Sequence, residues 1–113
     1  MSTYVLLLNY TEEGMRNIKY LPDHASAIRQ AVEAGGGRMP LIYLVMGQYD
    51  LMAIIEAPSD EACASISLAV CSAGNLRSNT MKVFGEEDFD ALVKNISSLE
   101  DEFTRILSQF NRT

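Results

Sequence analysis

The sequence predicts an α+β fold in which one antiparallel sheet carries its helices on a single face. Its predicted elements follow the order β-α-β-β-α-β, the split βαβ or ferredoxin-like arrangement. Two apolar runs of strand length flank a polar break at residues 47–50, which is typical of a β-hairpin. An amphipathic segment, residues 86–110, follows the last strand and predicts a helix outside that order. We therefore expect one domain over residues 1–113, with 86–113 as a C-terminal helical extension.

The first part of the chain predicts a strand and a helix. Residues 3–9 form an apolar run of strand length, and Thr11 after it is suited to cap a short helical turn. A longer helix is expected over about residues 23–34, because Pro22 is tolerated at a helix start. The glycines at 35–37 end this helix, since glycine adopts a left-handed cap without steric cost.

The remaining elements complete the sheet. Residues 39–46 and 50–57 are the two hairpin strands, and Ser59 is suited to cap a second helix that runs to residue 73. Residues 76–84 form the fourth strand. The crossover rule makes the first two strands parallel, so the third strand is inserted between them.

Apolar residues recur at spacings of three and four in the last segment. They are Phe89, Leu92, Val93, Ile96, Leu99, Phe103, Ile106, Leu107 and Phe110. As one helix this segment would be roughly 37 Å long, more than a domain of this size needs. A break at Ser97 and Ser98 is the alternative, because Ser98 with Asp101 could cap a new helix.

Three strands carry apolar side chains on both faces. In the first strand Leu6 and Leu8 alternate with Val5 and Leu7, and the two hairpin strands show the same pattern. Because the helices cover only one face, about seven or eight large apolar side chains would be exposed on the other, and a patch of that size marks an interface. We predict that two copies pack sheet on sheet, in which case the C-terminal helix could serve a higher oligomer or wrap the partner. The alternative is that the C-terminal helix covers the open face of its own sheet.

The composition counts against several function classes. The net charge is −6 and the nine Lys and Arg residues are scattered, which disfavours nucleic acid and anionic membrane surfaces. No run approaches the ~18 apolar residues of a membrane span, and the N-terminus lacks the features of a signal peptide, so we expect a cytoplasmic protein. Cys63 and Cys71 lie in one predicted helix, roughly 12 Å apart along its axis. That separation is too long for a disulfide, so we expect two small buried hydrophobes.

Several short motifs occur together in one order along the chain. They are Tyr4 to Asn9, Thr11-Glu12-Glu13-Gly14, Gly35-Gly36, Gly47-Gln48-Tyr49-Asp50, Glu56-Ala57-Pro58 with Asp60-Glu61, Gly74-Asn75-Leu76-Arg77, and Phe84 near Asp88-Phe89. In these motifs residues 3–90 resemble the GYD domain family of small bacterial and archaeal proteins. The resemblance implies the dimeric α/β-barrel superfamily, whose subunits pair through their sheets. The family has no assigned activity, although similar families include haem-dependent and cofactor-free oxygenases. His24 stands where Arg is expected in many relatives.

The predicted topology gathers polar side chains at one end of the sheet. The first strand ends there, the hairpin turns there, and both the fourth strand and the first long helix begin there. The candidate ligand-binding residues are Asn9, His24, Tyr49, Asp50, Asn75 and Arg77. Because ligand pockets combine an apolar lining with a few convergent polar groups, we expect these residues to rim one pocket.

Each candidate also has a structural interpretation. Tyr49 and Asp50 could hold a substrate hydroxyl or act as acid and base, or they could serve the turn itself. Arg77 could bind an organic anion, or it could pair with Asp50 or Asp88. His24 could be a general base or an axial haem ligand, or a surface or capping residue.

No cofactor and no stored metal ion are expected, since one His and two distant Cys fall short of three or four converging ligands. The sequence leaves catalysis undecided. The first hypothesis is an oligomeric small-molecule-binding or stress-related module. The second is a cofactor-independent enzyme of oxygenase or isomerase type that acts on a small aromatic or quinone-like compound. The third is a structural assembly unit. A deep apolar pocket near Tyr49 would favour the second, and a filled core would favour the others.

Overall fold

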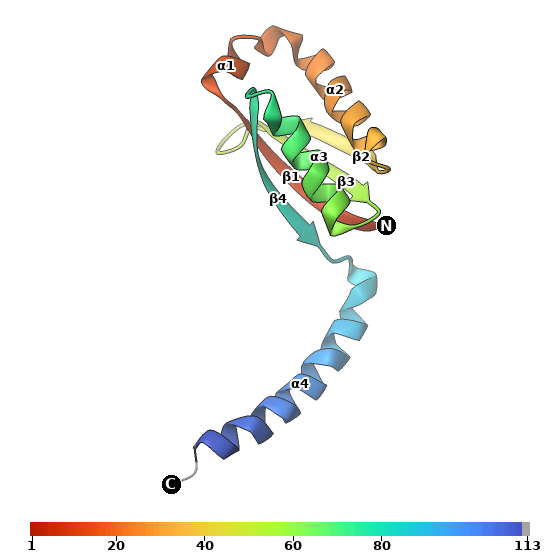
Figure 1. Cartoon of the computed structure of the whole chain (residues 1–113), viewed down its shortest axis with the longest axis vertical. Coiled ribbons are helices and arrows are strands. Elements are labelled where there is room, and N and C mark those ends of the chain that lie inside the picture. Colours follow the sequence, from red (N-terminus) through yellow and green to blue (C-terminus); the bar gives the residue numbers. More distant parts are fainter. Residues whose placement is uncertain (112–113) are drawn as a thin grey trace. The chain divides into compact units, whose positions relative to one another are not determined.

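The computed structural model describes residues 1–111 and divides the chain into two units (Figure 1). The first unit, Met1–Val83, contains the sheet and the helices that pack on it. The second, Phe84–Thr113, contains one long helix. Each unit has its own internal contacts.

The first unit has the predicted order of elements. They are β1 (Ser2–Tyr10), α1 (Glu12–Met15), a 3-10 turn (Ile18–Tyr20), α2 (Leu21–Ala34), β2 (Arg38–Leu44), β3 (Leu51–Ala57), α3 (Asp60–Ser72) and β4 (Leu76–Val83). The strand order is β2-β3-β1-β4, and every neighbouring pair is antiparallel. The ferredoxin-like prediction is therefore confirmed, with β3 inserted between the parallel strands β1 and β2.

Local hydrogen bonds explain where the helices begin and end. The hydroxyl of Thr11 accepts from the Gly14 N–H and that of Ser59 from the Ala62 N–H, each at 3.1 Å, so both predicted caps are confirmed. Helix α2 begins two residues earlier than predicted because Pro22 lies in its first turn. It ends where Gly36 adopts a φ of 84°, a conformation that favours glycine.

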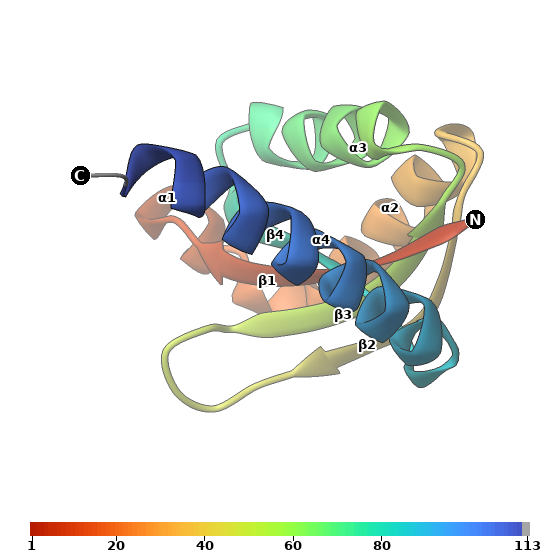
Figure 2. The same cartoon turned by 90° about the horizontal axis from the view of Figure 1, so that it is seen from below.

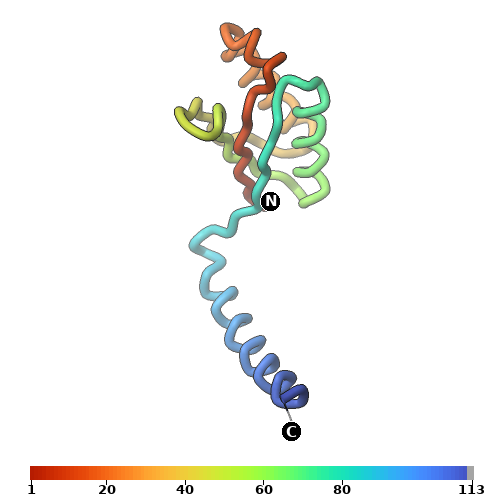
Figure 3. Tube along the Cα trace, turned by 90° about the vertical axis from the view of Figure 1, so that its left-hand side faces the viewer, coloured from red at the N-terminus to blue at the C-terminus, as the bar shows by residue number. Residues whose placement is uncertain are grey.

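Helices α2 and α3 both pack on one face of the sheet, as two views show (Figures 2 and 3). The side chains of this helix-covered face alternate along β1 and β3, and none of them is more than 3% exposed. They are Tyr4, Leu6, Leu8, Leu51, Ala53, Ile55 and Ala57. Ile28 and Val32 of α2 and Cys63 and Ile66 of α3 pack on this face, and the same core also contains Met39 and Leu76. Cys71 is only half-buried, and both cysteines are free.

The opposite face, which we call the open face, also carries large apolar side chains. The strand register pairs Leu7 with Met52, and Ile54 with both Val5 and Leu41. The complete apolar set is Val5, Leu7, Leu41, Tyr43, Met52, Ile54, Met81 and Val83. Tyr43 is 54% exposed and Met81 41% exposed. The predicted two-sided apolar character of the sheet is therefore confirmed.

The second unit consists of a 3-10 turn (Glu86–Asp88) and helix α4 (Phe89–Phe110). Helix α4 runs for 22 residues without interruption, so the alternative of a break at Ser97 and Ser98 is wrong. The apolar pattern explains this, because it continues across both serines from Ile96 to Leu99. None of the residues of α4 is buried.

Candidate functional site

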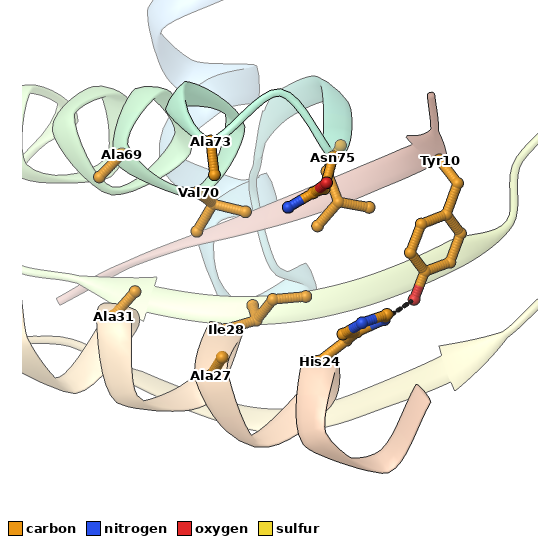
Figure 4. Close-up of a pocket in the computed structure, with 10 residues that line it drawn as sticks. Tyr10, His24, Ala27, Ile28, Ala31, Ala69, Val70, Ala73 and Asn75 are labelled. Atoms are coloured by element: carbon orange, nitrogen blue, oxygen red, sulfur yellow. Dashed lines mark hydrogen bonds between the residues drawn. The ribbon is translucent and has the colours of Figure 1, made fainter. Parts of the chain in front are cut away.

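A cavity of about 260 Å³ opens between α2 and α3, beside the end of β1 (Figure 4). Small side chains create it, because Ala27 and Ala31 of α2 stand opposite Ala69 of α3 and Ala73, which follows the end of α3. Larger side chains at these positions would fill the space, as they do in an ordinary core. The remaining apolar lining comes from Ile28, Val70 and Leu76. The site is therefore an apolar hollow above the core of the sheet.

The polar groups of the cavity lie at the end nearest β1. The Tyr10 hydroxyl and Nδ1 of His24 are 2.8 Å apart, and their rings are tilted with centroids 5.5 Å apart. Asn75 lines the same end (Figure 4). Burial raises the pKa of Tyr10, and the nearby Asp50 carboxylate raises it further. The phenol therefore keeps its proton at neutral pH and can donate a hydrogen bond.

Asp50 joins the hairpin loop to the end of β1. Its carboxylate accepts the Tyr10 N–H at 2.9 Å, and its own N–H donates to the Leu8 carbonyl at 2.9 Å. Its carbonyl accepts the N–H of Val45 at 2.8 Å, which closes the loop. The structural interpretation of Asp50 accounts for these contacts.

Three other candidates lie toward the open face. Asn9 and Arg77 are cross-strand partners, and both alternate with residues of the helix-covered face. The Tyr49 hydroxyl accepts a hydrogen bond from the Asn79 amide at 3.1 Å, and Asn79 is the cross-strand partner of Leu7 on the open face. Arg77 is exposed.

The structure therefore divides the six predicted site residues. It brings His24 and Asn75 to one cavity. It places Asn9, Tyr49 and Arg77 toward the open face. The Asp50 carboxylate is hydrogen-bonded to the backbone of Tyr10. The sequence prediction of a single rim does not describe this arrangement, because neighbouring residues of a strand point to opposite faces. Sequence reasoning missed Tyr10. The signal was available, since Tyr10 follows Leu8 by two residues and so shares its face.

A second polar cluster joins β1, β4 and the start of α3. The Tyr4 hydroxyl donates to the Asp60 carboxylate at 2.5 Å, and Nζ of Lys82 lies 3.1 Å from the same carboxylate. Hydrogen bonds from Tyr4 and then Lys82 lower the pKa of Asp60, while the bond to Asp60 raises the pKa of Tyr4. Because Tyr4 and Lys82 both bind the Asp60 carboxylate, this cluster is interpreted as structural.

Among residues 1–111, no three His, Cys, Asp or Glu side chains are grouped as metal ligands. No helix of the same range is both long enough and apolar enough to cross a membrane.

Comparisons with known proteins place this geometry in context. The Leucine response regulatory protein LrpA of Mycobacterium tuberculosis has a similar fold, with a TM-score of 0.54 at 14% sequence identity. The match covers 74% of this chain, which spans about half of that regulator (51%).

A sequence relative is the "Glutamine synthetase and cystathionine beta-lyase binding protein" of Thermus thermophilus. It is 26% identical over 95 residues, which are 83% of this chain and 100% of the relative. The family model of the GYD domain matches residues 4–93, well over half of the chain. The chain therefore belongs to the GYD domain family.

Proposed function

We propose that this chain is a homodimeric binding protein whose cavity between α2 and α3 takes one small, mainly apolar molecule. The observation that carries this proposal is the cavity itself, an apolar hollow with its polar groups gathered at one end. Its volume of about 260 Å³ lies just below the usual ~300–1,000 Å³ range of ligand pockets. A ligand of this size contains about one aromatic ring with a single polar substituent.

The polar end supports a ligand that accepts a hydrogen bond. The Tyr10 hydroxyl and Nδ1 of His24 share one hydrogen bond, whose direction depends on the His24 tautomer. In the tautomer in which Nδ1 accepts, the imidazole carries its proton on Nε2, which can donate to a ligand oxygen. The Asn75 amide offers both a donor and an acceptor at the same end. A phenol or quinone-like compound has the matching chemistry.

The arrangement does not bring the predicted acid and base candidates of the hairpin loop into the cavity. An acid–base pair needs two groups within hydrogen-bond reach of one substrate. Tyr49 bonds Asn79 toward the open face, and Asp50 bonds the backbone of Tyr10, so neither joins His24 in the cavity. The enzyme hypothesis of a Tyr49–Asp50 centre therefore receives no support from the geometry.

The open face supports pairing of two copies. Moving a large apolar side chain from full exposure to full burial contributes roughly 1.5–3 kcal/mol. Six of the eight are already half-buried in a single chain, so a partner supplies part of that amount at each of these positions. A second copy presents the same face, so a two-fold interface between sheets is self-complementary.

Nuclear magnetic resonance of the full chain, titrated with phenol, tests the ligand proposal. We expect phenol to shift resonances of Ala27, Ala31 and Ala73. Ala27→Leu should abolish these shifts because it fills the cavity. Ala34→Leu is the matched control, since Ala34 is exposed in the same helix and does not line the cavity.

His24→Ala tests the polar end separately. We expect it to weaken phenol binding by about tenfold, the usual value of one hydrogen bond, and to leave benzene binding unchanged. The proposal fails if millimolar phenol shifts none of these resonances. It also fails if Ala27→Leu binds phenol as well as the unmodified chain does.

A second candidate function is binding to an enzyme. The observation that favours it is the Thermus relative, whose printed name describes such binding and whose whole length is matched by this chain. The test is to sediment this chain together with glutamine synthetase and with cystathionine β-lyase. Both enzymes are purified from the organism that produces this chain. Co-sedimentation with either enzyme supports the candidate. Separate boundaries with both enzymes at micromolar concentration count against it.

A further inference from the structure

Helix α4 carries a strict seven-residue apolar repeat. One series is Phe89, Ile96, Phe103 and Phe110, and the other is Leu92, Leu99 and Ile106. These series occupy the a and d positions of a heptad, which is the pattern by which helices pack knobs into holes. Because the repeat is seven and not a multiple of 3.6, it suits a partner around which the helix supercoils.

The repeat has no partner in the second unit. Helix α4 has nine large apolar side chains, and the least exposed of them, Leu92, is 36% exposed. Phe103 and Phe110 are 61% and 79% exposed. Helix propensity by itself gives an isolated helix only marginal stability in water. A helix with an apolar stripe of this kind is therefore stabilised mainly when the stripe packs against another surface.

We propose that α4 packs against α4 helices of other copies of this chain, through the a and d positions. The three heptads span roughly 33 Å of helix, so the two series form one continuous seam. The e positions Val93 and Leu107 are also apolar, which widens the face to three positions in seven. A face of that width is typical of bundles with more than two helices.

The area of the seam agrees with a helix partner. A buried phenylalanine covers roughly 150–250 Å². The three phenylalanines of the seam are each more than half exposed, so together they leave about 290–480 Å² uncovered. That is close to half of the ~800 Å² that each partner contributes to a stable interface.

Charges beside the seam also permit self-association. Across the second and third heptads, the e and g positions carry two charges, Glu100 and Glu102. Glu102 already pairs with Arg105 of its own helix. Little like-charge repulsion would therefore oppose the approach of identical helices.

A pair of double variants in the full chain tests this proposal. Ile96→Asp/Phe103→Asp places two charges in the seam, and Ser97→Asp/Thr104→Asp places the same two charges one residue later, outside it. By analytical ultracentrifugation we expect the seam variant to lose half or more of the assembled mass. The control should keep the mass of the unmodified chain.

Folding is monitored in the same samples. All five tyrosines lie in residues 4–49, so tyrosine fluorescence reports only on the sheet unit. We expect its denaturation midpoint to be unchanged in both variants, while circular dichroism shows loss of helix in the seam variant alone. A further variant, Phe103→Leu, keeps an apolar a position and should keep the assembled mass.

The proposal is independent of sheet pairing, and Ile54→Asp separates the two. This open-face variant should lower the assembled mass by itself, and its combination with the seam charges should lower the mass further than either change alone. An unmodified chain that sediments as a single copy would overturn the α4 proposal, because α4 would then have no partner copy. An unchanged mass of the seam variant would overturn it too.

Discussion

Helices α2 and α4 are both amphipathic, yet only α2 buries its apolar side chains. In α2, Ile28 is 3% exposed and Val32 is fully buried. In α4, which is eight residues longer, every large apolar side chain is at least 36% exposed. The difference shows that an amphipathic pattern predicts the need for a partner surface, and not which chain supplies that surface.

Chain topology explains why α2 is buried. It connects β1 to the parallel strand β2, so both of its ends are held against one sheet. A crossover of this kind must pack back on the sheet. Helix α4 follows the last strand, and no later strand of the described residues draws it back.

Truncation of one isoleucine in each helix should separate α2 from α4 by the largest difference in stability. Ile28→Ala should cost the sheet unit roughly 2–5 kcal/mol of unfolding free energy, because it leaves a cavity in the core. Ile96→Ala should change the same quantity by less than about 0.5 kcal/mol, since it lies outside that core. Urea titration followed by tyrosine fluorescence measures both. Equal losses would contradict the separation of the two units.

A charge on the open face tests whether the sheet, like α4, needs a second copy. Ile54→Asp should halve the assembled mass in analytical ultracentrifugation, because it places a charge in the proposed sheet interface. Leu44→Asp is the matched control, since Leu44 is the cross-strand partner of buried Leu51 and so belongs to the other face. Unchanged mass in both variants would exclude sheet pairing, and a loss in the control alone would move the interface to the helix side.

Smaller effects are expected at the end of the sheet. Asp50→Ala should cost about 1–2 kcal/mol, because the Tyr10 N–H loses its acceptor. Arg77→Ala should cost less than about 0.5 kcal/mol, as an exposed residue does. Both variants should keep the assembled mass. Loss of assembly in either would make that residue part of an interface.

The smallest effect concerns pH and the cluster at the start of α3. The pKa of Asp60 is lowered in the folded chain, so its stabilising contribution is present above the unfolded pKa and is lost as pH falls through the folded value. The pKa of Tyr4 is raised, so its contribution is present below about pH 10 and is lost above it. Asp60→Asn should flatten the acid limb of stability against pH. An unchanged acid limb would show that other carboxylates set it.

Much of the fold was predictable because its signals are local. Alternation along β1 and β3 indicated two apolar faces, and Thr11 and Ser59 indicated the starts of two helices. The break at Ser97 and Ser98 was wrong because a local capping signal competed with an apolar repeat that continues through it.

The candidate site was less predictable. His24 and Asn75 were correctly placed at one end of the sheet, and the structure brings both to the cavity. Asn9 and Arg77 were placed at the same end, but topology alone does not say which face a side chain lies on. Tyr10 was missed because its partner, His24, is distant in sequence.

The order of elements, the inserted strand and the seven-residue repeat of α4 can be derived from the sequence, since periodicity and turn chemistry act between near neighbours. The folded chain is needed to show that α2 and α3 cover the face of Leu6 and Leu8, and that opposing alanines leave a cavity between the helices. Those outcomes depend on how side chains from distant segments fill shared space, which no single segment specifies.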